Sequence, residues 1–299
     1  MDSIDRQTAR LQHSPCVGVC TLDQATGWCL GCGRSGDEVA RWIAMSDAEQ
    51  LACWRDLPRR LERLEVAAHL LPWSVERIAN WIGATLTAGT GTWVVGVPGA
   101  LAEFPCGPEE GVRVERGPDA VFGRAAKAAF RLQLHEKLRA FAFGRTGPLV
   151  LGLPRARIVL PVADTLTLLG ADHKAIDAEH RAQSLFDFGL GRQGSRFCIR
   201  TGDPGLAAAL EAHCGSQWPS VMAAIGPMML ASSPHRVVES ALARIEVLTP
   251  IPTPGTMTPP GAHTHFLPEF LQAGEEAPAR LALPDYALPV AIYYPAPAV

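Results

Sequence analysis

Two hydrophobic patterns follow one another along the chain, a helical pattern near the front and strand patterns behind it. Ser35 stands three residues before Glu38, which is the spacing of a helix capping box, and Ser46 and Glu49 repeat it. Beyond Ser46, apolar residues recur at helical spacing and form one face, namely Leu51, Trp54, Leu57, Leu61 and Leu64. The pattern predicts two helices, the second kinked or interrupted at Pro58.

From about residue 90, segments rich in Val, Ile, Phe and Tyr, or alternating apolar with polar, predict strands. These segments are 92–97, 111–115, 129–135, 157–162, 196–201, 243–251 and 288–294. Segments of helical character are fewer, and they are 173–186, 204–214, 220–226 and 266–274. Strands grouped at the front with helices interspersed later favour an α+β fold with a substantial, mostly antiparallel sheet.

The length of 299 residues is enough for a well-packed domain and a small extra module. A Gly/Thr-rich break near residue 90 suggests where the two units join. We therefore expect a four-cysteine module with a helical tail at 1–70, a linker at 71–87 and a larger α+β domain at 88–299.

Composition limits the class of protein. Hydrophobic residues make up 47% of the chain, so it can bury a sizeable core, and the net charge of -3 argues against a general polyanion-binding surface. No apolar run approaches the ~20 residues that span a bilayer, and the polar start lacks a secretory core. We expect a cytoplasmic protein without membrane contact, in which cysteines stay reduced or bind metals.

The strongest candidate chemistry is the cysteine set Cys16, Cys20, Cys29 and Cys32, spaced C-x3-C-x8-C-x2-C. Four thiolates complete a tetrahedral shell for zinc or a ligand set for an iron–sulfur cluster. Gly31 and Gly33 flank the last cysteine and let the backbone turn tightly around a metal. The alternative is four buried thiols without a ligand role.

The choice between the two metals stays open. A glycine-flanked knuckle suits a single tetrahedral metal, and the C-x2-C-x2-C run of bacterial ferredoxins is absent, which favours zinc. The segment also resembles a small bacterial family of unknown function whose members are labelled predicted iron–sulfur proteins. The matching residues are Ser14, Pro15, Cys16, Gly18, Cys20, Gly27, Cys29, Gly31, Cys32, Gly33, Arg34, Glu38 and Trp42. The resemblance implies a shared metal site and supplies no activity.

A second candidate site lies near the end of the chain. His263 and His265 would point to the same face of an extended segment, and Glu269 completes an H-x-H-x3-E pattern. Together with His235 they could form a pocket that holds a second metal with an open position, as a metal-dependent enzyme requires. The alternative is a loop in which the imidazoles bind backbone carbonyls.

Two charged groups have plainer interpretations. Arg244 and Glu246 would share one strand face, where a cross-face ion pair explains them. A stripe of arginines follows the second predicted helix, at Arg55, Arg59, Arg60 and Arg63. It could contact an acidic partner or nucleic acid, but a solvated face is the preferred interpretation because the overall charge is acidic.

Three functions are therefore compatible with the sequence. The first is a metal-binding protein whose cysteine module is fused to a domain that binds a small ligand or an unidentified protein partner. The second is a metal-dependent enzyme with its site at the histidine loop. The third is a zinc-ribbon adaptor that contacts nucleic acid, and the acidic charge weighs against it.

Overall fold

The computed structural model of the chain describes residues 14–15, 22–64, 68–97, 100–143, 148–154, 160–191, 194–253 and 287–296. Within them, the strands of a smaller sheet are β1 (Ala68–Leu70), β2 (Thr92–Val97), β3 (Ala100–Pro105), β7 (Arg139–Phe143), β8 (Leu149–Pro154) and β14 (Ala287–Tyr294). The strands of a larger sheet are β4 (Arg113–Arg116), β5 (Ala120–Arg124), β6 (Ala128–Gln133), β9 (Thr167–Ala171), β10 (Ser184–Asp187), β11 (Arg196–Thr201), β12 (His235–Glu239) and β13 (Ala243–Val247). The predicted α+β class is confirmed.

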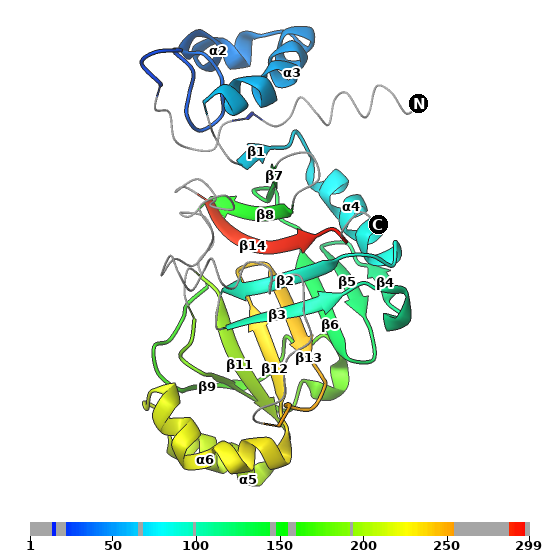
Figure 1. Ribbon diagram of the computed structural model, residues 1–299, viewed down its shortest axis with the longest axis vertical. Helices are drawn as coiled ribbons and strands as arrows, with labels where there is room; N and C mark the ends of the chain where they lie inside the picture. Colours follow the sequence, from blue (N-terminus) through cyan, green and yellow to red (C-terminus); the bar gives the residue numbers. More distant parts are fainter. Residues whose placement is uncertain are drawn as a thin grey trace.

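The strand order shows that both sheets are antiparallel and that distant segments meet. The smaller sheet runs β1-β7-β8-β14-β2-β3, so the C-terminal strand β14 lies at its centre (Figure 1). The larger sheet runs β4-β5-β6-β13-β12-β11-β10-β9. Strands β2 and β3 lie against β12 and β13, which places the main core between the two sheets.

Alternation along the strands decides which side chains enter that core. Trp93 of β2, Phe104 of β3 and Phe130 of β6 are fully buried there, and the rings of Trp93 and Phe130 stack with centroids 5.2 Å apart. Because successive side chains on a strand point to opposite faces, Arg131 points away from this core. The larger sheet therefore has a second, outer face, and its side chains are largely polar.

Most predicted strands match observed ones, and the predicted helix 266–274 lies outside the described residues. One other predicted helix and one predicted strand differ. The segment 173–186 is not the helix that its pattern predicts: it holds turns, the short 3-10 helix η3 (Ala178–His180) and strand β10. At the end of this segment, β10 pairs with β9 and β11, and their backbone hydrogen bonds override the local helix propensity there. In the predicted strand 157–162, residues 160–162 are irregular and the rest lies outside the described residues.

Residues 71–87, expected as a linker, contain helix α4 (Val75–Thr87). Ser74 caps it by accepting a hydrogen bond from the Arg77 N–H, and Ile78, Ile82 and Leu86 are buried in the main core. The Gly/Thr-rich break follows this helix at Gly89 and Gly91, both with positive φ. The helix thus packs with the sheets, while the boundary between units stays a prediction.

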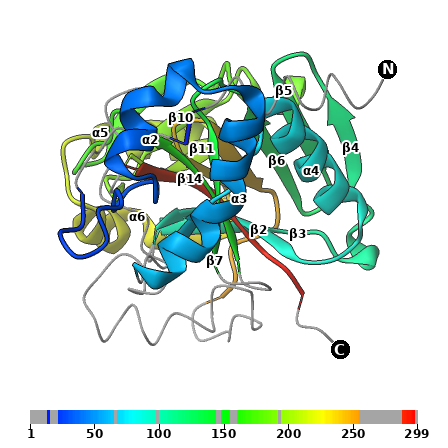
Figure 2. The same ribbon diagram turned by 90° about the horizontal axis from the view of Figure 1, so that it is seen from above.

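The front of the chain forms the two predicted helices. They are α2 (Gly36–Arg41), followed by the 3-10 turn η1 (Trp42–Ala44), and α3 (Asp47–Arg63), and both begin with a complete capping box. Pro58 lies inside α3, which continues past it. Trp54 and Leu57 pack with Phe141 and Val150, so the helices rest on strands of the smaller sheet, as the view from above shows (Figure 2).

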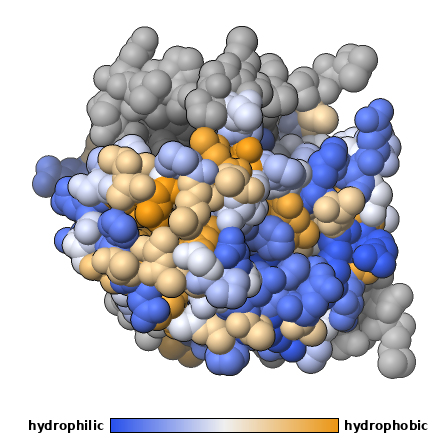
Figure 3. Space-filling model, turned by 90° about the horizontal axis from the view of Figure 1, so that it is seen from below, coloured by the Kyte–Doolittle hydropathy of each residue, from blue (hydrophilic) through white to orange (hydrophobic). Residues whose placement is uncertain are grey.

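At the opposite end, α5 (Pro204–Ala212) and α6 (Trp218–Ser232) pack against the β10 and β11 side of the larger sheet (Figure 1). The remaining regular element is the 3-10 turn η2 (Pro108–Glu110). Trp218 and Met228 of α6 stay partly exposed, and apolar and polar side chains intermingle on the lower surface (Figure 3). No helix in the described part of the chain is both long and apolar enough to cross a membrane.

Candidate metal centre and a buried charge network

Cys29 and Cys32 lie in a tight backbone turn. The Cys29 N–H donates to the Arg34 carbonyl at 2.7 Å, and the Gly33 N–H donates back to the Cys29 carbonyl at 2.7 Å. Gly33 has a φ of 75°, a conformation that residues with a Cβ rarely adopt. Both thiols are buried, at 0% and 2% exposure, so the CLGCGR segment forms the knuckle that its glycines predict.

Helix α3 fixes this knuckle from behind. A Cβ added at Gly33 would lie 3.2 Å from Leu61 Cγ, so the knuckle backbone approaches the helix closely. Arg60 of the same helix pairs with Glu38 at 2.5 Å and approaches the Gly33 carbonyl at 3.4 Å. The apolar face that the sequence predicts for this helix therefore supports the knuckle as well as the sheet.

A buried arginine sits beside the second thiol. Arg34 is 2% exposed, its Nε donates to Cys32 Sγ at 3.4 Å, and its guanidinium lies over the Trp42 ring, 4.7 Å from the centroid. Burial raises the pKa of the Cys32 thiol, and the hydrogen bond from Arg34 opposes that shift. Such a donor is suited to a sulfur that carries negative charge, as a metal-bound thiolate does.

The structure describes half of the predicted ligand set. Cys29 and Cys32 share one buried cluster, whereas Cys16 and Cys20 lie outside the described residues. Within the part of the chain that is described, no group of three or more His, Cys, Asp or Glu side chains is placed to hold a metal ion. The four-cysteine site accordingly stays a prediction, and one of its two pairs is buried in a tight, glycine-flanked turn.

Other cysteines have different surroundings. Cys53 lies in the same apolar cluster, where burial, followed by the charge of Glu38, raises the pKa of its thiol to about 12. Cys106 and Cys198 are fully buried, as expected for thiols that pack as small hydrophobes. Cys214, by contrast, is exposed.

The predicted histidine site is described only at His235, on β12. His263, His265 and Glu269 lie outside the described residues, so their proximity to His235 stays untested. His235 Nδ1 accepts a hydrogen bond from Arg200 at 3.1 Å, and its ring packs edge-on against His180 with centroids 4.9 Å apart. Burial, and secondarily the charge of Arg200, lowers the pKa of His235 to about 4.

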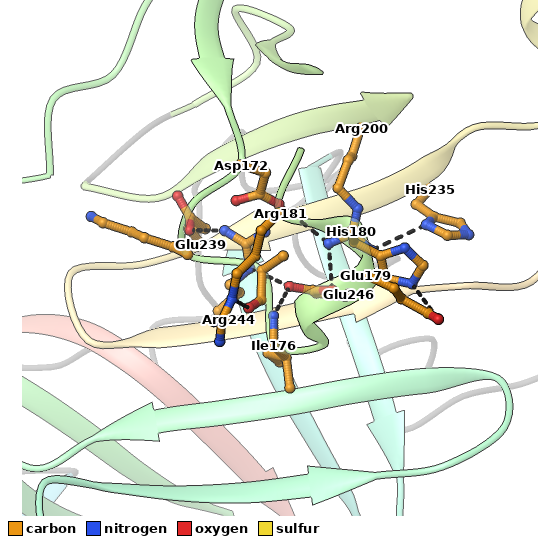
Figure 4. A network of polar contacts seen from close by, with 12 residues as sticks. Asp172, Ile176, Glu179, His180, Arg181, Arg200, His235, Glu239, Arg244 and Glu246 are labelled. Atoms are coloured by element: carbon orange, nitrogen blue, oxygen red, sulfur yellow. Dashed lines mark hydrogen bonds and ion pairs between the residues drawn. The ribbon is translucent and has the colours of Figure 1, made fainter. Parts of the chain in front are cut away.

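His235 belongs to a network of ion pairs on the outer face of the larger sheet (Figure 4). Its central members are buried to 5% exposure or less, namely Asp172, Arg200, Glu239, Arg244 and Glu246. Arg244 contacts all three carboxylates, with the Nε to Glu246 Oε1 distance at 2.6 Å. Arg200 donates to Glu246 Oε2 at 2.5 Å and to Asp172 Oδ2 at 3.2 Å. The predicted ion pair of Arg244 and Glu246 is confirmed.

Strand register produces this network. Arg196 lies opposite Glu239 in the pairing of β11 with β12, and Glu239 lies opposite Arg244 in the pairing of β12 with β13. Cross-strand neighbours on one face are close enough for their charges to pair. Burial alone would raise the pKa of Glu246, but the charges of Arg244 and Arg200 outweigh it and hold that pKa low.

A loop between β9 and β10 covers the network. Residues 172–183 form a compact loop closed by the Asp172 N–H bond to the Gln183 carbonyl at 2.9 Å. Polar contacts fasten it to the sheet: Asp172 pairs with Arg200 and Arg244, and the Ile176 N–H donates to Glu246 at 2.9 Å. Sequence patterns did not predict this loop. The charge network beneath it had a usable signal, namely the alternating Arg and Glu residues on the strands.

The arginine stripe on α3 is partly paired. Arg60 pairs with Glu38 and lies over Trp28, 5.5 Å from the ring centroid, and Arg63 lies over the same ring at 6.0 Å. Arg55 and Arg59 are exposed. Arg60 is thus ion-paired within the module, and the exposure of Arg55 and Arg59 agrees with the interpretation of a solvated face.

Comparisons with known proteins match the two parts of the chain separately. Residues 14–61 match the family described as protein of unknown function (DUF1289), which confirms the resemblance of the cysteine segment to a small family. In the same region, the uncharacterized protein YdhL of Escherichia coli (strain K12) is 46% identical over 51 residues, covering 17% of this chain and 63% of YdhL. YdhL of Shigella flexneri matches to the same extent.

The chain therefore spans less than two thirds of the length of these curated relatives. No solved structure matches. The second family model, described as a family of unknown function (DUF6925), matches residues 77–299 and so includes both sheets apart from strand β1. Because this match covers more than half of the sequence, the chain belongs to the DUF6925 family.

Proposed function

We propose that the protein binds one metal centre through Cys16, Cys20, Cys29 and Cys32, as zinc or as an iron–sulfur cluster. The observation that supports this most is the knuckle, in which Cys29 and Cys32 are buried with a glycine of positive φ and a buried arginine beside the sulfur. Two buried thiols with a charge-assisted donor suit thiolate ligation. Cys16 and Cys20 would supply the other two ligands.

The two metals would supply different functions. Zinc would hold the short segment around the knuckle to the helices and act structurally, whereas an iron–sulfur cluster could carry an electron. In either case the larger domain would bind a small ligand or a protein partner. We infer a cytoplasmic location for such a protein, since thiol ligands stay reduced there.

Metal analysis of matched variants tests this proposal. The double variant Cys16→Ser, Cys29→Ser removes one ligand from each pair, and we expect it to lose the bound metal completely. Cys106→Ser is the control, because that thiol is buried in the core between the sheets. Colourless protein with one zinc per chain would select zinc, and brown protein that bleaches in air would select iron–sulfur. Metal retained at one equivalent in the double variant would contradict the proposal.

A further inference from the structure

On the outer face of the larger sheet, one arginine has no carboxylate partner among the described residues. Arg196, Arg200 and Arg244 pair with the buried carboxylates Asp172, Glu239 and Glu246. A fourth guanidinium, that of Arg131 on β6, points to the same face. No contact with a carboxylate is found for it among the described residues.

Strand register makes the position of Arg131 costly. It lies directly opposite Arg244 in the pairing of β13 with β6. Like charges opposite one another on adjacent strands destabilise a sheet. Burial, and next the positive charge of Arg244, lowers the pKa of Arg131. Each of the carboxylates Glu239, Glu246 and Asp172 acts on this pKa in the opposite direction, with a smaller effect than Arg244.

The hydrogen bonds of Arg131 are incomplete. Its Nη1 donates to the Lys174 carbonyl of the covering loop at 2.8 Å, while its buried Nε has no partner in the described structure. Two neighbouring groups in the network are also incomplete, the Nε of Arg200 and the Oδ1 of Asp172, and both side chains are at most 1% exposed. Buried polar atoms without partners are rare in folded proteins and call for an explanation.

Solvent reaches Arg131 although its neighbours are sealed. Arg131 is only partly buried, whereas Arg244 beside it is fully buried. The covering loop exposes charges of both signs, with Lys174 and Arg181 against Glu179. A small negatively charged group could therefore approach Arg131 from solvent without displacing a carboxylate that is already bound to it.

We propose that Arg131, at the edge of the 172–183 loop, is the anchor of a binding site for a small molecule bearing an oxyanion, a carboxylate or a phosphate. The planar guanidinium fork of arginine matches either group with two parallel hydrogen bonds. The bound oxyanion would offset the repulsion between Arg131 and Arg244 and would accept from the partly exposed Nη end of the guanidinium, since the Nε is buried. This site is separate from the cysteine module and does not depend on a metal.

Titration with inorganic phosphate and with malonate tests the site and separates the two oxyanion classes. On the wild-type protein, we expect at least one of the two to raise the melting temperature saturably, beyond chloride at equal ionic strength. Arg131→Gln should weaken that apparent affinity at least about tenfold. Arg113→Gln is the control, since Arg113 is exposed on the edge strand β4, and its affinity should match the wild type.

A measurement on the wild-type protein covers the case in which Arg131→Gln does not fold. Phenylglyoxal modifies accessible arginines, and the oxyanion that stabilises the protein should protect Arg131 and leave Arg113 reactive, as mass spectrometry of the peptides would show. The proposal is overturned if neither anion exceeds chloride, if Arg131→Gln responds as the wild type does, or if Arg131 is modified equally with and without the anion.

Discussion

The cysteine knuckle and the charged sheet face both bury polar groups, and they differ in how those groups are satisfied. On the sheet face, the chain supplies both signs of charge, so three carboxylates and three arginines meet within one network. At the knuckle, two thiols and one arginine meet, and the sequence offers two more thiols close by. The contrast indicates a structural role for most of the sheet network and a ligand role for the knuckle.

The largest effect should come from removing the centre of the sheet network. Arg244→Ala removes one partner from each of three buried carboxylates. We expect the free energy of unfolding to fall by about 3–5 kcal/mol. Chemical denaturation at neutral pH measures it. Arg116→Ala is the control, because Arg116 pairs with Glu76 at the surface and should cost about 1 kcal/mol or less. Equal losses in both variants would contradict the structural role of the network.

A smaller effect is expected at the knuckle itself. Gly33→Ala puts a Cβ on a residue with φ of 75° and 3.2 Å from Leu61, so we expect a loss of about 1–2 kcal/mol together with a lower metal content. Gly27→Ala is matched, since Gly27 has φ of 69° and no atom within 4 Å of the added Cβ. Gly27→Ala should lose stability but keep its full metal content. If both variants lost metal equally, the result would contradict a specific role of the knuckle turn in metal binding.

The smallest effect concerns the pH dependence of stability. His235 has a folded pKa of about 4 against 6.5 when unfolded, so the unfolded chain takes up its proton first as pH falls. This contribution to stability is complete above pH 6.5 and is lost as pH falls from there toward 4. Because the ring is partly exposed, we expect roughly 1 kcal/mol or less between pH 7 and pH 5.5.

Denaturation at several pH values in this range measures the slope. His235→Gln should flatten it, and His173→Gln should leave it unchanged, because His173 is exposed on the covering loop. An unaltered slope in His235→Gln would show that the imidazole titrates in the folded protein as it does in the unfolded chain.

Local patterns predicted some parts of the structure well. Capping boxes located the starts of α2 and α3, and alternation located β2, β11 and β13, because these signals depend on neighbouring residues. The segment 173–186 failed, since its conformation depends on pairing with β9 and β11 and on contacts to distant arginines. Its helical spacing of apolar residues could not reveal those partners.

The candidate sites divide in the same way. The knuckle was predictable because its glycines and cysteines are adjacent in sequence. The pairing of Arg244 with Glu246 followed from alternation on one strand, and the structure confirms it. The contribution of Asp172 could not be foreseen, since it reaches Arg244 across 72 residues of sequence. Arg131 was missed for a similar reason: only the strand register places it opposite Arg244.

The central claim is that four cysteine sulfurs hold the metal. X-ray absorption spectroscopy of the purified protein, at the zinc or iron edge, counts the sulfur neighbours directly. We predict four sulfur neighbours for each metal atom and no nitrogen or oxygen ligands. For zinc all four are cysteine sulfurs at about 2.3 Å, and for an iron–sulfur cluster they are cysteine and bridging sulfide sulfurs. A shell that contains histidine nitrogen or carboxylate oxygen, or only two sulfurs, would contradict the four-cysteine site.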